Sequence, residues 1–95
     1  MRMMLKWTVP VEKGNTMVDD GSMGTVIEAV MAKAEPEAAY FMPLEGRRAG
    51  LLFFDMEEPA DIAGIAEILF READAAVEFT PVMNADDLKK ALSSL

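Results

Sequence analysis

The feature that most constrains the fold is the apolar run Arg48–Met56, which reads Arg-Ala-Gly-Leu-Leu-Phe-Phe-Asp-Met. A Gly-Arg turn precedes this run and a Glu-Glu-Pro break follows it, a pattern typical of a strand buried on both faces. Such a strand lies at the centre of a sheet and needs cover on each side. The rest of the sequence provides helices for one side only. We therefore expect the second face of the sheet to be covered by something other than the helices of this chain.

Alternation of apolar and polar residues predicts a first strand over residues 1–10. One face of this strand carries Met1, Met3, Leu5, Trp7 and Val9, and the other carries Arg2, Met4, Lys6 and Thr8. Two edge strands are predicted at 37–44 and 75–83, because Pro43 and Pro81 lack the N–H that a central strand needs. A tight turn over residues 45–48 joins the 37–44 strand to the central run as a hairpin.

Apolar stripes at helical spacing predict two main helices. The first stripe runs from Met23 to Ala34, with Ser22 as the N-cap and Pro36 as the stop, and the second runs from Ile62 to Ala73. Residues 10–21 are expected to form a polar connection with at most one helical turn. Asn84 is expected to cap a last short helix whose acidic residues come first.

The predicted order is β-α-β-β-α-β followed by a short C-terminal helix, in one domain spanning residues 1–95. This order predicts a ferredoxin-like α+β fold. Its four antiparallel strands are expected in the order 4-1-3-2, with both main helices on one face of the sheet. The other face is then open.

Composition limits the classes of partner. The chain is 52% hydrophobic at only 95 residues, which favours an oligomeric interface, and its net charge of −8 disfavours nucleic acids and anionic membranes. No run of 18 apolar residues is present. The N-terminal segment is interrupted by Lys6 and ends at Pro10, so it does not resemble a signal peptide, and a cytoplasmic location is the default expectation. An RNA-binding domain of the same strand order needs aromatic side chains on its third strand, where this chain has Ala49 and Leu51.

The absence of cysteine and histidine limits the chemistry. It excludes disulfides, thiolate nucleophiles, Ser-His-Asp triads, and zinc or haem sites held by histidine. Adjacent acidic pairs stand at turns or helix starts, where they favour capping over metal binding, and the chain has no phosphate-binding glycine motif. We therefore expect no metal and no cofactor of the protein's own, and any catalysis must use Asp, Glu, Lys, Arg, Tyr40, backbone groups or a borrowed cofactor.

The strand–helix order, the Arg48–Met56 run and the closing segment Glu78-Phe-Thr-Pro-Val-Met-Asn-Ala-Asp-Asp-Leu88 resemble the dimeric α/β-barrel superfamily of small ferredoxin-like proteins. The ending looks especially like a small bacterial group of uncharacterised proteins, in which a Pro-Val strand end leads into a short helix. The resemblance extends over the whole chain and implies a homodimer closed through the sheet faces. Haem-binding members and several catalytic members use a histidine that this sequence lacks, so their activities are not implied.

Two facing sheets would bring the mixed faces of the first and last strands inward. Lys6 and Glu78 are then expected as cross-strand partners, either as a structural ion pair or as the polar end of an apolar ligand pocket. The candidate ligand-binding residues are Lys6, Glu78, Thr8, Thr80 and Tyr40. Three functions stay open: binding of a small, largely apolar molecule between the sheets; a cofactor-independent monooxygenase- or isomerase-like enzyme; and a protein-interaction module without a ligand pocket.

Overall fold

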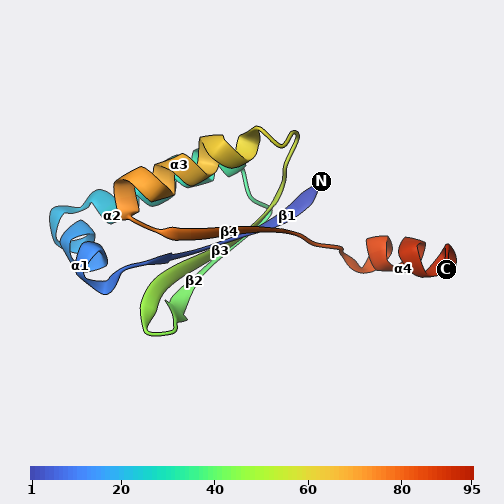
Figure 1. Cartoon of the computed structure of the whole chain (residues 1–95), viewed down its shortest axis with the longest axis horizontal. Coiled ribbons are helices and arrows are strands. Elements are labelled where there is room, and N and C mark those ends of the chain that lie inside the picture. The colour runs from blue at the N-terminus through green and yellow to red at the C-terminus, as the bar shows by residue number, and fades with distance from the viewer.

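The computed structural model describes residues 1–95 and has an α+β architecture. Its elements are, in chain order, β1 (Arg2–Val9), α1 (Val11–Asp20), α2 (Ser22–Ala34), β2 (Ala38–Leu44), β3 (Arg47–Asp55), α3 (Asp61–Ala73), β4 (Ala76–Pro81) and α4 (Ala85–Ser93). Figure 1 shows α2 and α3 lying over one face of the sheet and α1 at one end of it. None of the helices has both the length and the apolar character needed to cross a membrane.

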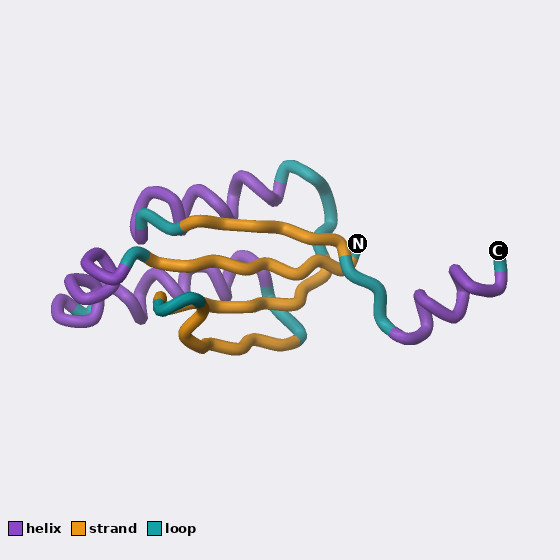
Figure 2. The backbone as a smooth tube through the Cα atoms, turned by 60° about the horizontal axis from the view of Figure 1, so that its bottom comes forward, coloured by secondary structure: helices purple, strands orange, loops and turns teal.

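All four strands form one antiparallel sheet (Figure 2). Their order is β2-β3-β1-β4, which is 4-1-3-2 when it is read from the opposite edge. Pro43 lies in β2 and Pro81 ends β4, and both strands are at edges, as expected for a residue that cannot donate to the ladder. The central positions belong to β3 and β1.

The core lies between the sheet and the helices. Along β1 the burial alternates at every residue, and Met3, Leu5, Trp7 and Val9 are the buried set, which confirms the predicted alternation. They pack in one cluster with side chains from the other elements, which include Val26, Val30, Leu52, Phe54, Ile65 and Leu69. On the opposite face, the side chains of β1 and the Leu51 and Phe53 side chains of β3 are only half-buried, because no helix of the chain covers that face.

Three local predictions were wrong. Residues 11–20 form a ten-residue helix rather than a polar connection, although only Gly14 and Met17 of α1 are buried. Ser22 is the first residue of α2 and not its cap, since the Asp20 carboxylate accepts the hydrogen bond from the Ser22 N–H at 2.8 Å. β4 is shorter than expected and ends at Pro81.

The β2–β3 hairpin turns on two residues with positive φ, Glu45 at 51° and Gly46 at 78°. Two successive positive φ angles characterise the tight hairpin turn whose twist matches that of the flanking strands. The turn fixes the register in which Leu44 pairs with Arg47 and Tyr40 pairs with Leu51. It therefore decides which side chains of β2 reach each face of the sheet.

Helix α4 projects away from the rest of the protein (Figures 1 and 2). The molecule measures 51 × 27 × 18 Å, and its radius of gyration is 14.8 Å, whereas a compact domain of this length is expected near ~12 Å. Asn84 forms the predicted capping box with Asp87: its side chain accepts from the Asp87 N–H at 2.8 Å, and the Asn84 N–H donates to Asp87 Oδ2 at 3.1 Å. The capping box therefore stabilises the N-terminus of α4, but no residue of the helix is buried.

Candidate functional site

The sheet face opposite the helices is the first candidate site, and we refer to it as the open face. The strand register assigns its residues, since side chains paired across neighbouring strands lie on the same side. In the order of the strands, it carries Ala38, Tyr40, Met42 and Leu44 from β2; Arg47, Ala49, Leu51, Phe53 and Asp55 from β3; Arg2, Met4, Lys6 and Thr8 from β1; and Ala76, Glu78 and Thr80 from β4. Most of these side chains are apolar.

One row crosses the middle of the open face and contains three of the five candidate residues. Tyr40 pairs with Leu51, Leu51 pairs with Lys6, and Lys6 pairs with Glu78. The register therefore places Tyr40 on the same face as Lys6, a position that the sequence alone left undecided. Two strand spacings separate Tyr40 from Lys6, about 9.6 Å, so the phenol and the ammonium are not in contact across the flat sheet.

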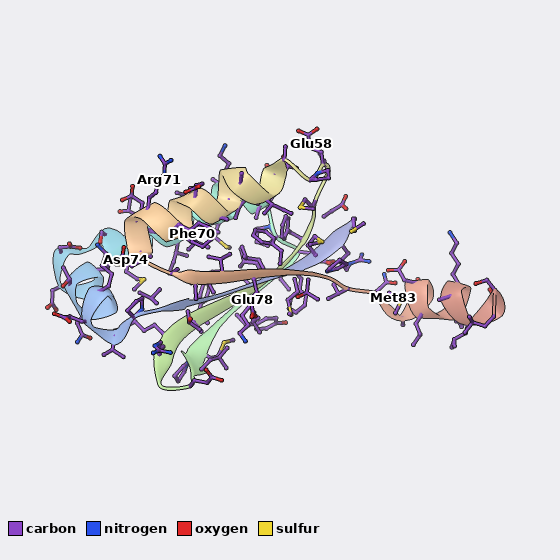
Figure 3. All side chains as sticks on the ribbon, viewed as in Figure 1. Glu58, Phe70, Arg71, Asp74, Glu78 and Met83 are labelled. Carbon is purple, nitrogen blue, oxygen red and sulfur yellow. The ribbon has the colours of Figure 1, made fainter.

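Lys6 and Glu78 form the expected cross-strand pair. Lys6 Nζ lies 3.6 Å from Glu78 Oε2, and their side chains are 39% and 69% exposed. Figure 3 shows Glu78 projecting from β4 on the side away from α3. The pair lies in the middle of an apolar surface and remains accessible in the isolated chain, so it can meet either a facing sheet or a ligand.

The two candidate threonines flank this pair. Thr80 pairs with Met4 and Thr8 pairs with Ala76, so the hydroxyls lie one row to either side of Lys6 and Glu78. Lys6, Glu78, Thr8 and Thr80 therefore form one polar group on β1 and β4. Tyr40 belongs to the opposite edge and joins this group only through the row described above.

The open face is not part of the acidic surface of the protein. Although the whole chain has a net charge of −8, the face presents Lys6 and Glu78 in its middle row, Arg47 at the hairpin end, and Arg2 beside Asp55 at the other end. At its end, Arg2 Nε donates to Glu37 Oε1 at 2.8 Å, and this hydrogen bond raises the pKa of Arg2 above its usual value. A second copy of the chain would therefore meet a nearly neutral surface here, without the repulsion that the net charge suggests.

A second candidate site lies on the helix side of β2, and we call it the α1–β2 groove. It is an apolar groove of about 590 Å³. Its lining comprises Trp7, Val9, Val11, Asn15, Val18, Met23, Ile27, Phe41, Met42, Pro43, Gly46, Arg47, Arg48 and Ala49. Trp7 and Phe41 meet edge to face in it, with ring centroids 6.1 Å apart. Sequence reasoning missed this groove because its lining comes from five separate elements.

Two arginines without carboxylate partners lie at the groove. Arg2 and Arg71 form ion pairs, whereas Arg47 and Arg48 form none, and the groove lining contains no acidic residue. Arg48 Nη1 instead donates to Asn15 Oδ1 at 3.1 Å, and the guanidinium packs where a Cβ at Gly14 would collide with it. The sequence placed residues 45–48 in the hairpin turn, whereas the structure has Arg47 and Arg48 in β3, with Arg48 fixed against α1.

Neither site gathers metal ligands, and no group of three or more acidic side chains is placed to hold an ion. What the two sites offer instead is apolar surface with a few placed charges: one ion pair on the open face and two arginines at the groove. Comparison with known proteins does not assign either site, since no family model, no curated protein and no solved structure matches the chain.

Proposed function

We propose that the protein is a homodimer of ferredoxin-like subunits, closed through the open faces as in dimeric α/β barrels, and that it binds a small, largely apolar molecule between the two sheets. The observation that carries the proposal is the open face itself: an uncovered, largely apolar sheet surface with one ion pair, Lys6–Glu78, in its middle row on the β4 side.

The case for a second copy as the cover is physical. Leu51 and Phe53 are half-buried on the open face, and Met42 is half-buried beside them, because no helix of the same chain reaches them. Monomeric soluble proteins rarely leave a contiguous apolar surface of this kind uncovered. The near-neutral charge of the face permits a like-charged copy to approach, and a two-fold axis needs no other partner.

The proposed ligand follows from the residues that would face the space between the sheets. Apolar side chains would surround most of the molecule, and Lys6 with Glu78 would supply one polar end. Thr8 and Thr80 add hydroxyl groups that donate or accept beside that end. Pockets of this kind are mostly apolar and contain a few placed polar groups that orient the ligand.

A cofactor-independent enzyme is the second candidate, favoured by the alignment of Tyr40, Lys6 and Glu78 in one row. Proton transfer needs groups within hydrogen-bond reach of a common atom. Tyr40 lies two strands from Lys6, about 9.6 Å away, and its side chain is 58% exposed. Binding is therefore the function that the geometry supports better.

Size-exclusion chromatography with light scattering at micromolar concentration tests the assembly. The expected mass is twice the 10.4 kDa of one chain. The charge reversal Glu78→Lys, opposite Lys6, should shift the population toward monomer, whereas Glu72→Lys on α3 should not. A wild-type mass of a single chain across the micromolar range contradicts the dimer.

Binding of 8-anilinonaphthalene-1-sulfonate, a fluorescent apolar anion, tests the ligand chamber. We expect saturable fluorescence enhancement that Lys6→Met weakens by about tenfold, because the sulfonate loses its partner. Arg48→Met is the matched control and separates the open face from the α1–β2 groove. Equal binding by the wild type and Lys6→Met, with loss in Arg48→Met, moves the binding site to the groove and refutes the chamber. Native mass spectrometry of the purified protein then shows whether a small molecule accompanies it.

A further inference from the structure

Helix α4 has an apolar side that is exposed in its own chain. Leu88 and Leu92 are four residues apart and share one side of the helix, and Leu95 follows on the same side. These three side chains are 46%, 58% and 97% exposed. The complete capping box at the start of α4 shows that the helix forms although its apolar side is not packed against another element.

We propose that α4 of one copy docks in the α1–β2 groove of a second copy, and that two copies exchange their C-terminal helices in this way. The inference rests on the proposed homodimer and adds a second interface to it. It joins the exposed apolar side of α4 to the α1–β2 groove, which lies mainly on the helix side of the sheet and shares Met42, Arg47 and Ala49 with the open face.

The groove of the same chain is out of reach of α4. The helix leaves the sheet at the start of β1, where the Val82 N–H donates to the Arg2 carbonyl at 3.1 Å. The groove lies at the other end of β1, at Trp7 and Val9, beside the opposite edge strand β2. Seven residues of strand span about 23 Å, whereas the three residues that connect β4 to α4 span at most about 10 Å. Figure 1 shows α4 and α1 at opposite ends of the molecule.

A two-fold axis between the sheets solves this problem. Helix α4 and the groove occupy diagonally opposite corners of the sheet, one beside β4 and the other beside β2. A two-fold axis can lie in the plane between two facing sheets and run along the other diagonal, through the remaining two corners. Rotation about this axis places the α4 corner of one copy opposite the groove corner of the other. The α4 of each copy then leaves its sheet at the corner of the other sheet where the groove lies, and it must pass round the β2 edge of that sheet to reach the helix side. The sheets cross near a right angle, which is one of the two common packing angles.

The charges of the two surfaces are complementary. The groove carries Arg47 and Arg48, neither of which has a carboxylate partner in the chain. The first turn of α4 carries Asp86 and Asp87. Asp87 pairs with Arg2 of its own chain at 3.2 Å, whereas Asp86 forms no ion pair and is free to meet the arginines. Docking places this acidic turn near the arginines while Leu88 and Leu92 enter the apolar part of the groove.

The area also favours the exchange. Four strands about 4.8 Å apart and seven residues of about 3.3 Å give a face of roughly 19 × 23 Å, so two facing sheets bury about 900 Å² in projection. A stable interface usually buries about 1,200–2,000 Å². A nine-residue helix about 13 Å long and 10 Å wide adds roughly 260 Å² with its groove, and two such contacts bring the total to about 1,400 Å².

A cysteine cross-link tests the contact directly, since the chain has no native cysteine. One chain carries Leu92→Cys, and a second, distinguished by a size tag, carries Val18→Cys in the groove. After mixing and mild oxidation we expect a mixed disulfide dimer as the main product. The matched control replaces Val18→Cys by Phe70→Cys on α3, which is similarly exposed but lies outside the groove and the open face. Equal mixed product with Phe70→Cys, or none with Val18→Cys, overturns the exchange.

Sedimentation equilibrium separates failure of the exchange from failure of the dimer. Removal of residues 84–95, or the substitution Val18→Asp, should raise the dimer dissociation constant by about 100-fold, whereas Phe70→Asp should leave it unchanged. A wild-type dimer with an unchanged constant after removal of residues 84–95 refutes the exchange and leaves the sheet dimer intact. A wild-type monomer refutes both. Decanoate can be added to the full chain and to the chain that lacks residues 84–95, with Trp7 fluorescence as the readout. An equal change in both proteins would show that the groove is open to small molecules although α4 is present, and this too refutes the exchange.

Discussion

The indole of Trp7 lies across the backbone of Gly50, its partner in the β1–β3 register, and fills the space that a Cβ at Gly50 would need. The ring atoms Cζ2, Cη2 and Cε2 all stand in that space, so the overlap involves the rigid body of the indole. Gly50 is therefore required by a close approach within the core, and not by its backbone angles.

We expect Gly50→Ala to lower the free energy of unfolding by about 2–3 kcal/mol, because the buried indole must leave its position and lose its present packing. Urea denaturation followed by far-UV circular dichroism measures the change. The matched control is Gly64→Ala on the exposed side of α3, where nothing lies within 4 Å of the new Cβ. That control should raise the free energy of unfolding by about 0.5–1 kcal/mol. A Gly50→Ala protein as stable as the wild type contradicts the packing described here.

The pair Lys6–Glu78 should contribute little to the stability of an isolated chain. Both side chains are more than a third exposed, and pairs of this kind contribute about 0–1 kcal/mol. In a dimer closed through the open face the same pair is desolvated, and its effect should appear in the dissociation constant. Lys6→Glu should raise that constant at least about tenfold, and the exchange of both charges, Lys6→Glu with Glu78→Lys, should restore much of it. The comparison uses sedimentation equilibrium at one salt concentration. A double variant no tighter than Lys6→Glu alone would show that the two side chains are not coupled.

Much of the fold could be predicted because the relevant signals are local. The alternation in β1 assigns each side chain to a face, and Lys6 and Glu78 both appear mid-strand in apolar surroundings, so their pairing follows once β1 and β4 are neighbours. Helix α1 was missed because Gly14 and the polar residues around it resemble a connection. The reason for Gly14 is tertiary: it leaves room for Arg48 from another element.

The α1–β2 groove and the position of α4 could not be predicted from the sequence, because both depend on tertiary packing. A capping box shows that a helix begins at Asn84, but it carries no information on what the helix packs against. The pair Arg47–Arg48 was a visible signal, since two adjacent arginines are conspicuous in a chain with net charge −8. Their place beside Trp7, Val18 and Phe41 depends on the register of the hairpin and on the path of α1.

The capping box of α4 should be measurable by hydrogen exchange. In Asn84→Ala the Asp87 N–H loses its acceptor, and a lost cap of this kind costs a helix about 1 kcal/mol. Because no residue of α4 is buried and its link to the sheet is the surface ion pair Arg2–Asp87, its amides should exchange several-fold faster while the amides of β1 and β3 remain unchanged at concentrations where the protein is monomeric. The control is Ser93→Ala, which removes a hydrogen bond near the end of the same helix. Equal acceleration in α4 and in the sheet would show that α4 is coupled to the core.

The carboxylate of Asp20 should make the junction between α1 and α2 sensitive to acid. Its hydrogen bond from Ser22 holds the pKa of Asp20 below its usual value, since the charged form accepts that bond at the start of α2. A carboxyl group with a lower pKa in the folded state than in the unfolded state stabilises the fold above the unfolded value, near ~3.9, and loses that contribution as the pH falls through the folded value. The wild type should therefore lose stability in this acidic window relative to Asp20→Asn, which cannot titrate there.

Urea denaturation of both proteins between pH 2 and pH 7, together with an NMR titration of the Asp20 carboxyl, measures the effect. Because Asp20 is exposed, the difference should be small, and Asp19→Asn, at a neighbouring carboxyl group without this hydrogen bond, should parallel the wild type. An Asp20 carboxyl that titrates at its ordinary value would contradict the capping role.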